Sequence, residues 1–174
     1  LYQGEELGLE EAELSFEDLR DPLGIRFWPG VKGRDGCRTP MAWEAGAGNG
    51  GFTTGKPWLP VPASHRARAV DVQNGEEGSV LAAYRSMLAL RKRHPGLVKG
   101  SIRFLDTEGD VLAFIREADG ERLVCAFNFA DEPAVWPLPM ELGRIETMDL
   151  GAGAAMHEDG LSLPPLGFFV GHAG

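Results

Sequence analysis

Basic residues are the scarcer charged class in this sequence. Its 17 lysines and arginines stand against 26 aspartates and glutamates, so the net charge is −9 and the pI is near 4.9. A protein that binds nucleic acid normally presents a basic face, so we expect no nucleic-acid partner. No apolar run approaches the ~18 residues that a membrane span requires, so we expect no membrane partner either.

Cysteine is also scarce. Cys37 and Cys125 belong to no CxxC or CxxH word, so their spacing predicts neither a zinc site nor a disulfide framework. An incidental pair is one interpretation; two buried, reduced thiols in a cytoplasmic protein is the favoured one, with the periplasm left open. We predict no cofactor and no metal, and the residues His157, Glu158 and Asp159 of a glycine-rich turn are only a weak metal candidate.

An initial methionine is missing too. The chain begins at Leu1, and no signal-like segment follows it. The opening residues LYQGEE are typical of a segment inside a domain and not of its start. We therefore expect that an N-terminal part of the protein precedes this chain.

A long irregular segment is the most informative part of what is present. Residues 32–43, KGRDGCRTPMAW, are too polar for a buried strand and too interrupted by Gly and Pro for a helix. The aromatic residues around them argue against disorder, because disordered segments are poor in aromatics. Long irregular segments of compact chains are usually functional. We therefore predict an ordered, site-lining loop over residues 21–63, in which Phe52 and Trp58 anchor the turn-rich segment GFTTGKPW.

Two words in this loop look like phosphate-binding motifs but lack their context. Residues 46–51 fit GxGxxG, yet no strand precedes them and Pro57 prevents an early helix. Residues 50–56 fit GxxxxGK, yet Pro57 takes the place of the Ser or Thr that would bind magnesium. Neither word predicts a phosphate site.

The second half of the chain has regular patterns. Residues 79–94 predict a helix that Ser79 caps and that Pro95-Gly96 ends, with an apolar stripe at helical spacing. From residue 97 on, short β-branched and aromatic runs alternate with turn residues, and Asp119-Gly120 is a strong hairpin signal. This pattern predicts an antiparallel sandwich or Greek-key module, with a boundary near residue 96.

The words LYQGEELGL, DPLGIRFWP, KGRDGCRTPMAW and GFTTGKPWLPV, in this order, resemble the C-terminal part of α-glucosidases. The resemblance is to the oligo-1,6-glucosidase-like branch of the α-amylase superfamily, glycoside hydrolase family 13, and it covers residues 1 to about 98. It implies an α/β-barrel remnant (the end of strand 8, a long loop and the last barrel helix) in residues 1–96. An all-β antiparallel Greek-key sandwich domain would then follow in residues 97–174. It also implies that the catalytic residues lie upstream, so we expect none in this chain and expect the missing N-terminal barrel portion to be its partner.

The first candidate site residues are acidic. Retaining glycosidases need two carboxyl groups about 5–5.5 Å apart, but neighbours on a strand point to opposite faces, so Glu5 and Glu6 are not expected to form such a pair. One is expected to be ion-paired inside the barrel rim and the other to lie at the barrel mouth, close to substrate. Residues 10–20 predict an acidic helix or helical turn, either a solvated face or part of the active-site mouth. The resemblance implies that Glu11 lies near the aglycone side of the sugar.

The second candidates lie in the loop. The guanidinium groups of Arg34 and Arg38 can each grip two sugar hydroxyls, or can tie the loop to Glu5, Glu6 or Asp35. The residue types alone favour the second role, in which each arginine holds the loop to a carboxylate. The resemblance implies instead that Arg34 contacts the non-reducing-end glucose, whereas Arg38, Asp35 and Trp43 keep loop-structural roles.

The sequence thus predicts the C-terminal piece of a retaining α-glucosidase that hydrolyses terminal bonds of α-glucoside oligosaccharides. The alternative is a non-catalytic sugar-binding or scaffolding β module, which would have no reason to carry the barrel-end word LYQGEE. Transglycosylation and isomerisation are not distinguished from hydrolysis. The apolar flank of the predicted helix would be left uncovered, so we also expect self-association or retention of the N-terminal portion.

Overall fold

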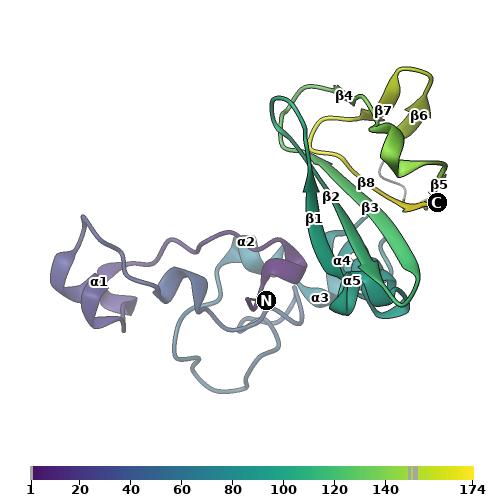
Figure 1. Ribbon diagram of the computed structural model, residues 1–174. Helices are drawn as coiled ribbons and strands as arrows, with labels where there is room; N and C mark the ends of the chain where they lie inside the picture. The colour runs from purple at the N-terminus through teal and green to yellow at the C-terminus, as the bar shows by residue number, and fades with distance from the viewer. Residues whose placement is uncertain (1, 149, 151–152) are drawn as a thin grey trace. The chain divides into compact units, whose positions relative to one another are not determined.

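Short helical segments and loops make up the first half of the chain, and antiparallel strands make up most of the second half (Figure 1). The computed structural model describes residues 2–148, 150 and 153–174. Its residues fall into two units, Leu1–Leu88 and Ala89–Gly174, which are described separately below. The boundary near residue 96 stays a prediction. Among the described helices, none combines the length and the apolar character that crossing a membrane requires.

The first unit is built from 3-10 turns and short helices. They are η1 (Glu5–Leu7), η2 (Phe16–Asp18), α1 (Pro22–Phe27), η3 (Asp35–Cys37), α2 (Ala63–Arg66), α3 (Val70–Gln73) and the start of α4 (Val80–Arg93). The structure describes no strand in residues 2–88. Residues 2–4 form a turn that leads into η1, and residue 1 lies outside the described part. The predicted strand end is therefore not found there, because a strand needs neighbouring strands to pair with its backbone.

Of the two alternatives for residues 10–20, a helix or a helical turn, the helical turn is found: it is η2, in a segment without other helical residues. One further expectation for this unit needs correction. The loop predicted over residues 21–63 contains α1, whose start Asp21 caps by accepting the N–H of Leu23 at 2.9 Å. The helices α2 and α3 follow this loop, and the sequence pattern does not indicate them because each is only one turn long.

The apolar core of the first unit is small. Leu7, Met41 and Leu81 are buried together, with Leu9 and Val70 packed against them. These residues come from η1, the loop, α3 and α4. Distant parts of the sequence therefore meet at one point.

The predicted helix is confirmed as α4. The Ser79 hydroxyl accepts the N–H of Ala82 at 3.2 Å, which is the expected cap. The helix ends at Arg93, His94 is extended, and Pro95 then starts α5 (Pro95–Lys99). The apolar stripe is only partly covered: Leu81 is buried, whereas Leu88 is 38 % exposed.

The second unit contains two antiparallel sheets. The strands are β1 (Ser101–Leu105), β2 (Val111–Ala118), β3 (Glu121–Asn128), β4 (Ala134–Trp136), β5 (Ile145–Thr147), β6 (Ala155–His157), β7 (Gly160–Leu163) and β8 (Phe168–Ala173), with the 3-10 turn η4 (Met140–Leu142) between β4 and β5. One sheet has the order β1-β2-β3-β8-β5 and the other the order β4-β7-β6. The predicted antiparallel β region is confirmed.

The β2–β3 hairpin turns at the dipeptide that the sequence singled out. Asp119 and Gly120 both have positive φ, 54° and 82°, as a two-residue hairpin turn of the primed type requires. A second hairpin, β6–β7, forms around residues 157–159, and the glycine-rich turn expected there is its turn, with Glu158 and Asp159 between the strands. Its pattern was too short to detect, since only Leu161 and Leu163 alternate with a polar residue.

Alternation along the strands separates two faces of the five-stranded sheet. Ala113, Ile115, Val124, Ala126 and Phe169 contribute to one core, which Trp136, Leu161 and Leu163 of the smaller sheet complete. The opposite face carries a row of phenylalanines whose neighbouring ring centroids lie 5.8–6.3 Å apart: Phe104, Phe114, Phe127 and Phe168. Phe104, at the end of the row, is 62 % exposed.

Candidate functional site

Gly36 lets the segment of residues 9–12 pass directly over η3. The N–H of Ala12 donates to the carbonyl oxygen of Gly36 at 2.9 Å. A Cβ on Gly36 would lie 2.5 Å from the Ala12 carbonyl oxygen and 2.6 Å from Cγ of Glu11. Any side chain at this position would displace Glu11, so Gly36 helps to set where that exposed carboxylate lies.

Asp35 ties η3 to the start of α1. Its side chain is 1 % exposed, and its Oδ2 accepts the N–H groups of Arg20 at 2.5 Å and Asp21 at 2.7 Å. A buried carboxylate is stable only when such donors replace its water. These contacts organise the loop.

The carboxylate of Asp21 holds the backbone of Arg34 by a hydrogen bond. Its Oδ1 accepts the N–H of Leu23, and its Oδ2 accepts the N–H of Arg34 at 2.9 Å. The hydrogen bond from Leu23, followed by the one from Arg34, lowers the pKa of the Asp21 carboxyl. Nη1 of Arg38 lies 3.9 Å from the same Oδ2.

The two loop arginines therefore differ in their surroundings. Arg38 was expected to hold the loop to Glu5, Glu6 or Asp35. Its partner is Asp21 instead. Arg34 is exposed, and its guanidinium has no hydrogen bond or ion pair to any residue that the structure describes. Arg34 thus has a fixed backbone and a side chain that is available to a ligand.

Glu5 and Glu6 lie on η1 and have separate partners. The Glu5 carboxylate accepts the hydroxyl of Tyr84 from α4. This hydrogen bond lowers the pKa of Glu5 and raises the pKa of Tyr84 to about 12. Glu6 accepts the N–H of Gly4 at 2.8 Å within its own turn. The expected ion pair is absent among the described residues, where hydrogen bonds take its place.

Two buried polar residues beside this site had no signal in the sequence. Nε2 of His65 donates to the carbonyl oxygen of Glu10 at 2.8 Å, and its Nδ1 lies 3.1 Å from the Thr39 hydroxyl. Gln73 donates to the carbonyl oxygens of Leu7 and Arg68 and accepts the N–H of Leu81. Both residues stand in a polar stretch without periodicity, so only the folded structure identifies their partners.

A small hollow brings some of the predicted residues together. Glu5 and Glu11 line a cavity of about 120 Å³ with Cys37 and His65. Ligand pockets usually measure about 300–1,000 Å³, so these residues do not enclose a sugar by themselves. Glu6 lines a separate hollow beside α4, and Arg34 lines neither.

The loop aromatics are not its anchors. Phe52 and Trp58 are each about half exposed, so their expected anchoring role is wrong. The side chain of Asn49 holds that turn instead, by donating to the carbonyl oxygens of Thr53 and Gly55. Trp43 takes part through its backbone: its N–H donates to Gly50, and its carbonyl accepts the N–H of Asp71.

The two thiols differ in environment. Cys125 is buried, and this burial raises its pKa to about 11. Cys37 is exposed, which contradicts the expectation of two buried thiols. Cys37 is the last residue of η3, and its Sγ donates to the carbonyl oxygen of Arg34 at 3.1 Å.

The described residues form no group of metal ligands at residues 157–159, the weak candidate from the sequence, and none in the first unit. Within residues 2–88, no three His, Cys, Asp or Glu side chains converge closely enough to hold an ion. His157, Glu158 and Asp159 are exposed, and no converging group in the described part of the second unit includes them.

Two family models match the chain one after the other. The model described as "Alpha amylase, catalytic domain" matches residues 1–100. The model described as "Maltogenic Amylase, C-terminal domain" matches residues 102–170.

Several known proteins align with most of the chain. A probable alpha-glucosidase of Rhizobium meliloti (strain 1021) is 54 % identical over 149 residues, which cover 86 % of this chain and 26 % of that protein. A probable oligo-1,6-glucosidase 2 of Bacillus subtilis (strain 168) is 33 % identical, with 84 % of this chain and 29 % of that protein covered. The chain thus spans less than a third of the length of these relatives.

Solved structures resemble the chain over its whole length. The alpha-glucosyl transfer enzyme XgtA superposes with a TM-score of 0.92 at 52 % identity, covering 100 % of this chain and 32 % of that one. The trehalulose synthase MutB from Pseudomonas mesoacidophila MX-45 superposes with a TM-score of 0.80 at 28 % identity, covering 100 % and 35 %.

Proposed function

The chain belongs to the α-amylase family, and we propose on this premise that it works as the C-terminal portion of a retaining α-glucosidase. The reaction would be hydrolysis of terminal α-glucosidic bonds in short oligosaccharides. The nucleophile and the acid/base carboxyl group that retention requires would come from a preceding barrel portion. This chain would supply the loop at the sugar site and the β domain.

The order of the two matched families carries this proposal. A catalytic-domain match directly followed by a C-terminal-domain match is the arrangement of the end of such an enzyme. The share of the relatives that the chain covers, 26 % and 29 %, supports the same view. The separate partners of Glu5 and Glu6 support it further, since these two carboxylates do not form a glycosidase pair.

Within the proposed enzyme, Arg34 would bind the glucose at the cleavage site and Glu11 would contact the aglycone. The freely exposed guanidinium of Arg34, on a backbone that Asp21 fixes, suits a substrate contact. Paired guanidinium donors match two adjacent hydroxyls of one sugar ring. Hydrogen bonds of this kind raise the rate if they strengthen in the transition state.

A chimera tests the proposal. The matching C-terminal segment of the Rhizobium meliloti relative would be replaced by this chain, and glucose release from 4-nitrophenyl α-glucoside and maltose would be measured. We expect activity in the chimera and none in the relative truncated before that segment. We also expect no activity from this chain alone.

Two results would overturn the proposal. One is a folded chimera as inactive as the truncated relative. The other is hydrolysis by this chain alone, which would place catalytic groups within it. Tight binding of maltose by this chain without the barrel would favour the alternative, a non-catalytic sugar-binding module.

A second reaction has a specific observation in its favour. The solved structure that superposes with a TM-score of 0.92 is described as an alpha-glucosyl transfer enzyme. Transfer differs from hydrolysis in whether water or a second sugar attacks the glucosyl intermediate. The ratio of new disaccharides to free glucose, measured at high maltose concentration in the chimera, decides between the two.

A further inference from the structure

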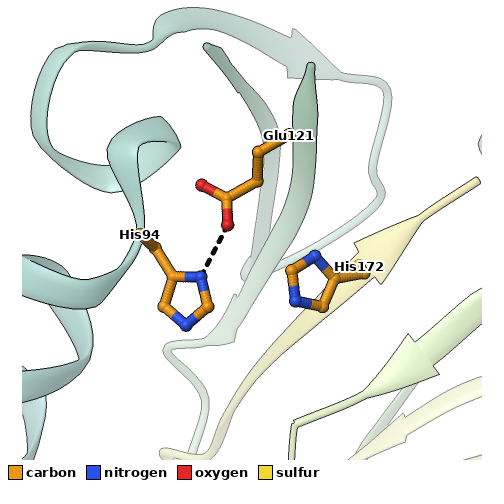
Figure 2. A group of neighbouring side chains, drawn as sticks. All are labelled: His94, Glu121 and His172. Carbon is orange, nitrogen blue, oxygen red and sulfur yellow. Dashed lines mark hydrogen bonds and ion pairs between the residues drawn. The ribbon is translucent and has the colours of Figure 1, made fainter. Parts of the chain in front are cut away.

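Three potential metal ligands from separate elements converge in the second unit. His94 follows the end of α4, Glu121 opens β3, and His172 lies near the end of β8 (Figure 2). One ligand atom from each side chain can be chosen so that all three lie within 4.8 Å of one another. All three residues are partly buried.

The register of the sheet explains this convergence. Leu123 of β3 pairs with His172 of β8, so their side chains share one face of the sheet. Glu121 precedes Leu123 by two residues and therefore points to the same face. The α5 helix packs on β2 and β3, and it holds the preceding His94 beside them.

Hydrogen bonds position two of the three groups already. Nδ1 of His94 lies 2.6 Å from Oε1 of Glu121, and the N–H of Gly96 donates to Oε2 at 2.8 Å. The ring of His172 meets that of His94 edge-on, with centroids 5.5 Å apart. Burial raises the pKa of Glu121, but the hydrogen bonds from His94 and Gly96 outweigh it, so the pKa is lowered overall and the carboxylate stays charged.

We propose that His94, Glu121 and His172 form a binding site for a divalent transition metal of the zinc class. Two imidazoles and one carboxylate are ligands that zinc accepts at about 2.0–2.2 Å, with water in the fourth position. Ligand atoms around tetrahedral zinc lie about 3.4 Å apart. Separations of up to 4.8 Å must therefore shrink by roughly 1.4 Å at most, and the 2.6 Å between Nδ1 of His94 and Oε1 of Glu121 must widen by roughly 0.8 Å. Rotation of the partly exposed side chains supplies this adjustment.

The metal takes the place of the proton between His94 and Glu121. The Nδ1 and Oε1 atoms that now share a hydrogen bond both coordinate the ion, and His172 adds the third protein ligand. Binding requires deprotonated ligands, so it weakens as the pH falls. The bound ion would link the start of α5 to β3 and β8 and so stabilise the second unit.

Zinc binding to the whole chain tests this proposal. The exposed thiol of Cys37 is first removed by Cys37→Ser, because it could bind zinc by itself. Calorimetry with ZnCl2 alone should show one ion per chain, and excess zinc should raise the thermal midpoint by about 4 °C or more relative to EDTA. Cobalt in place of zinc should give visible absorption bands.

Variants separate this site from surface binding. His172→Asn should abolish the zinc effect while leaving the chain folded in EDTA, since the His172 side chain makes a ring contact with His94 but no hydrogen bond among the described residues. His157→Asn, at an exposed histidine outside the group, should keep the full effect. If His172→Asn does not fold, Glu121→Gln serves as the second variant and should also lose zinc binding.

Three outcomes overturn the proposal. They are the absence of zinc binding in the Cys37→Ser chain, binding that survives both His172→Asn and Glu121→Gln, and binding that His157→Asn removes. In each case the three residues form an ion pair and a ring contact without a metal.

Discussion

Buried polar side chains organise the first unit at the scale of single residues. Its apolar core is small, but Asp35, His65 and Gln73 each join segments that are far apart in the sequence. Gln73 is 8 % exposed and uses both ends of its amide. Loss of such a residue leaves buried carbonyl and N–H groups without partners, which costs more than the hydrogen bonds themselves contribute.

We predict that Gln73→Leu lowers the unfolding free energy of the first unit by about 3 kcal/mol, because the polar groups of Leu7 and Leu81 lose their partners. The urea dependence of amide exchange in residues 70–88 measures this change. Gln3→Leu is the control, since Gln3 is exposed and its one hydrogen bond, to the carbonyl oxygen of Thr39, is long at 3.4 Å. Equal stability of the two variants would contradict the role of Gln73.

We predict that Arg34→Ala in the chimera lowers kcat/KM by about 10- to 100-fold, the value of one or two charged hydrogen bonds to the sugar. The initial rates of maltose hydrolysis measure this effect. Arg26→Ala is the matched control, because the guanidinium of Arg26 lies over the ring of Phe27. A chimera with Arg34→Ala that keeps full activity would remove Arg34 from the site.

Sequence reasoning about these residues succeeded only in part, for a physical reason. Residue type shows that Arg34 and Arg38 can bind sugar or carboxylate, but the partner depends on which segment passes nearby. Asp21 takes that place for Arg38 because it lies at the start of α1, a helix that the pattern did not reveal. Likewise, positions 94, 121 and 172 are too far apart for any spacing rule to connect.

Periodicity and turn chemistry were sufficient at the scale of elements where a segment is long. They located α4, and they located the hairpin of β2 and β3, which has eight residues in each strand. They failed for η1 and for α1, because one or two turns carry no readable period. The β6–β7 hairpin was missed for the same reason.

We predict that Gly120→Ala destabilises the β2–β3 hairpin by about 1–2 kcal/mol, since a Cβ is unfavourable at a φ of 82°. Faster amide exchange of residues 111–128 would report this loss. Asp119→Asn is the control in the same turn: Asn tolerates positive φ, and the exposed ion pair with Lys99 contributes little. Unchanged exchange in Gly120→Ala would show that the turn adopts another conformation.

At the scale of the whole molecule, the two units differ in what they leave uncovered. The first exposes part of the α4 stripe, and the second exposes the end of its phenylalanine row. Apolar surface of this kind is typical of proteins that pack against a further partner. Self-association therefore stays a prediction, as does contact with a preceding barrel portion.

We predict that one thiol of the native chain reacts rapidly with Ellman's reagent and that the second reacts only after unfolding. Cys37 is exposed, whereas burial of Cys125 and its pKa of about 11 keep that thiol protonated and inaccessible. Cys37→Ser should abolish the rapid phase. Two rapid thiols would contradict the burial of Cys125, and reduced thiols in freshly isolated protein would support our proposal of a cytoplasmic location.

The place of β8 in its sheet has a consequence for synthesis on the ribosome. This strand pairs with both β3 and β5, yet it begins 40 residues after β3 ends, from Asn128 to Phe168. Ribosomes add about 5–20 residues per second, so about 2–8 s pass between the synthesis of β3 and that of β8. During that interval the nascent chain presents an unpaired strand edge, which is a template for pairing with other chains until residue 173 has emerged.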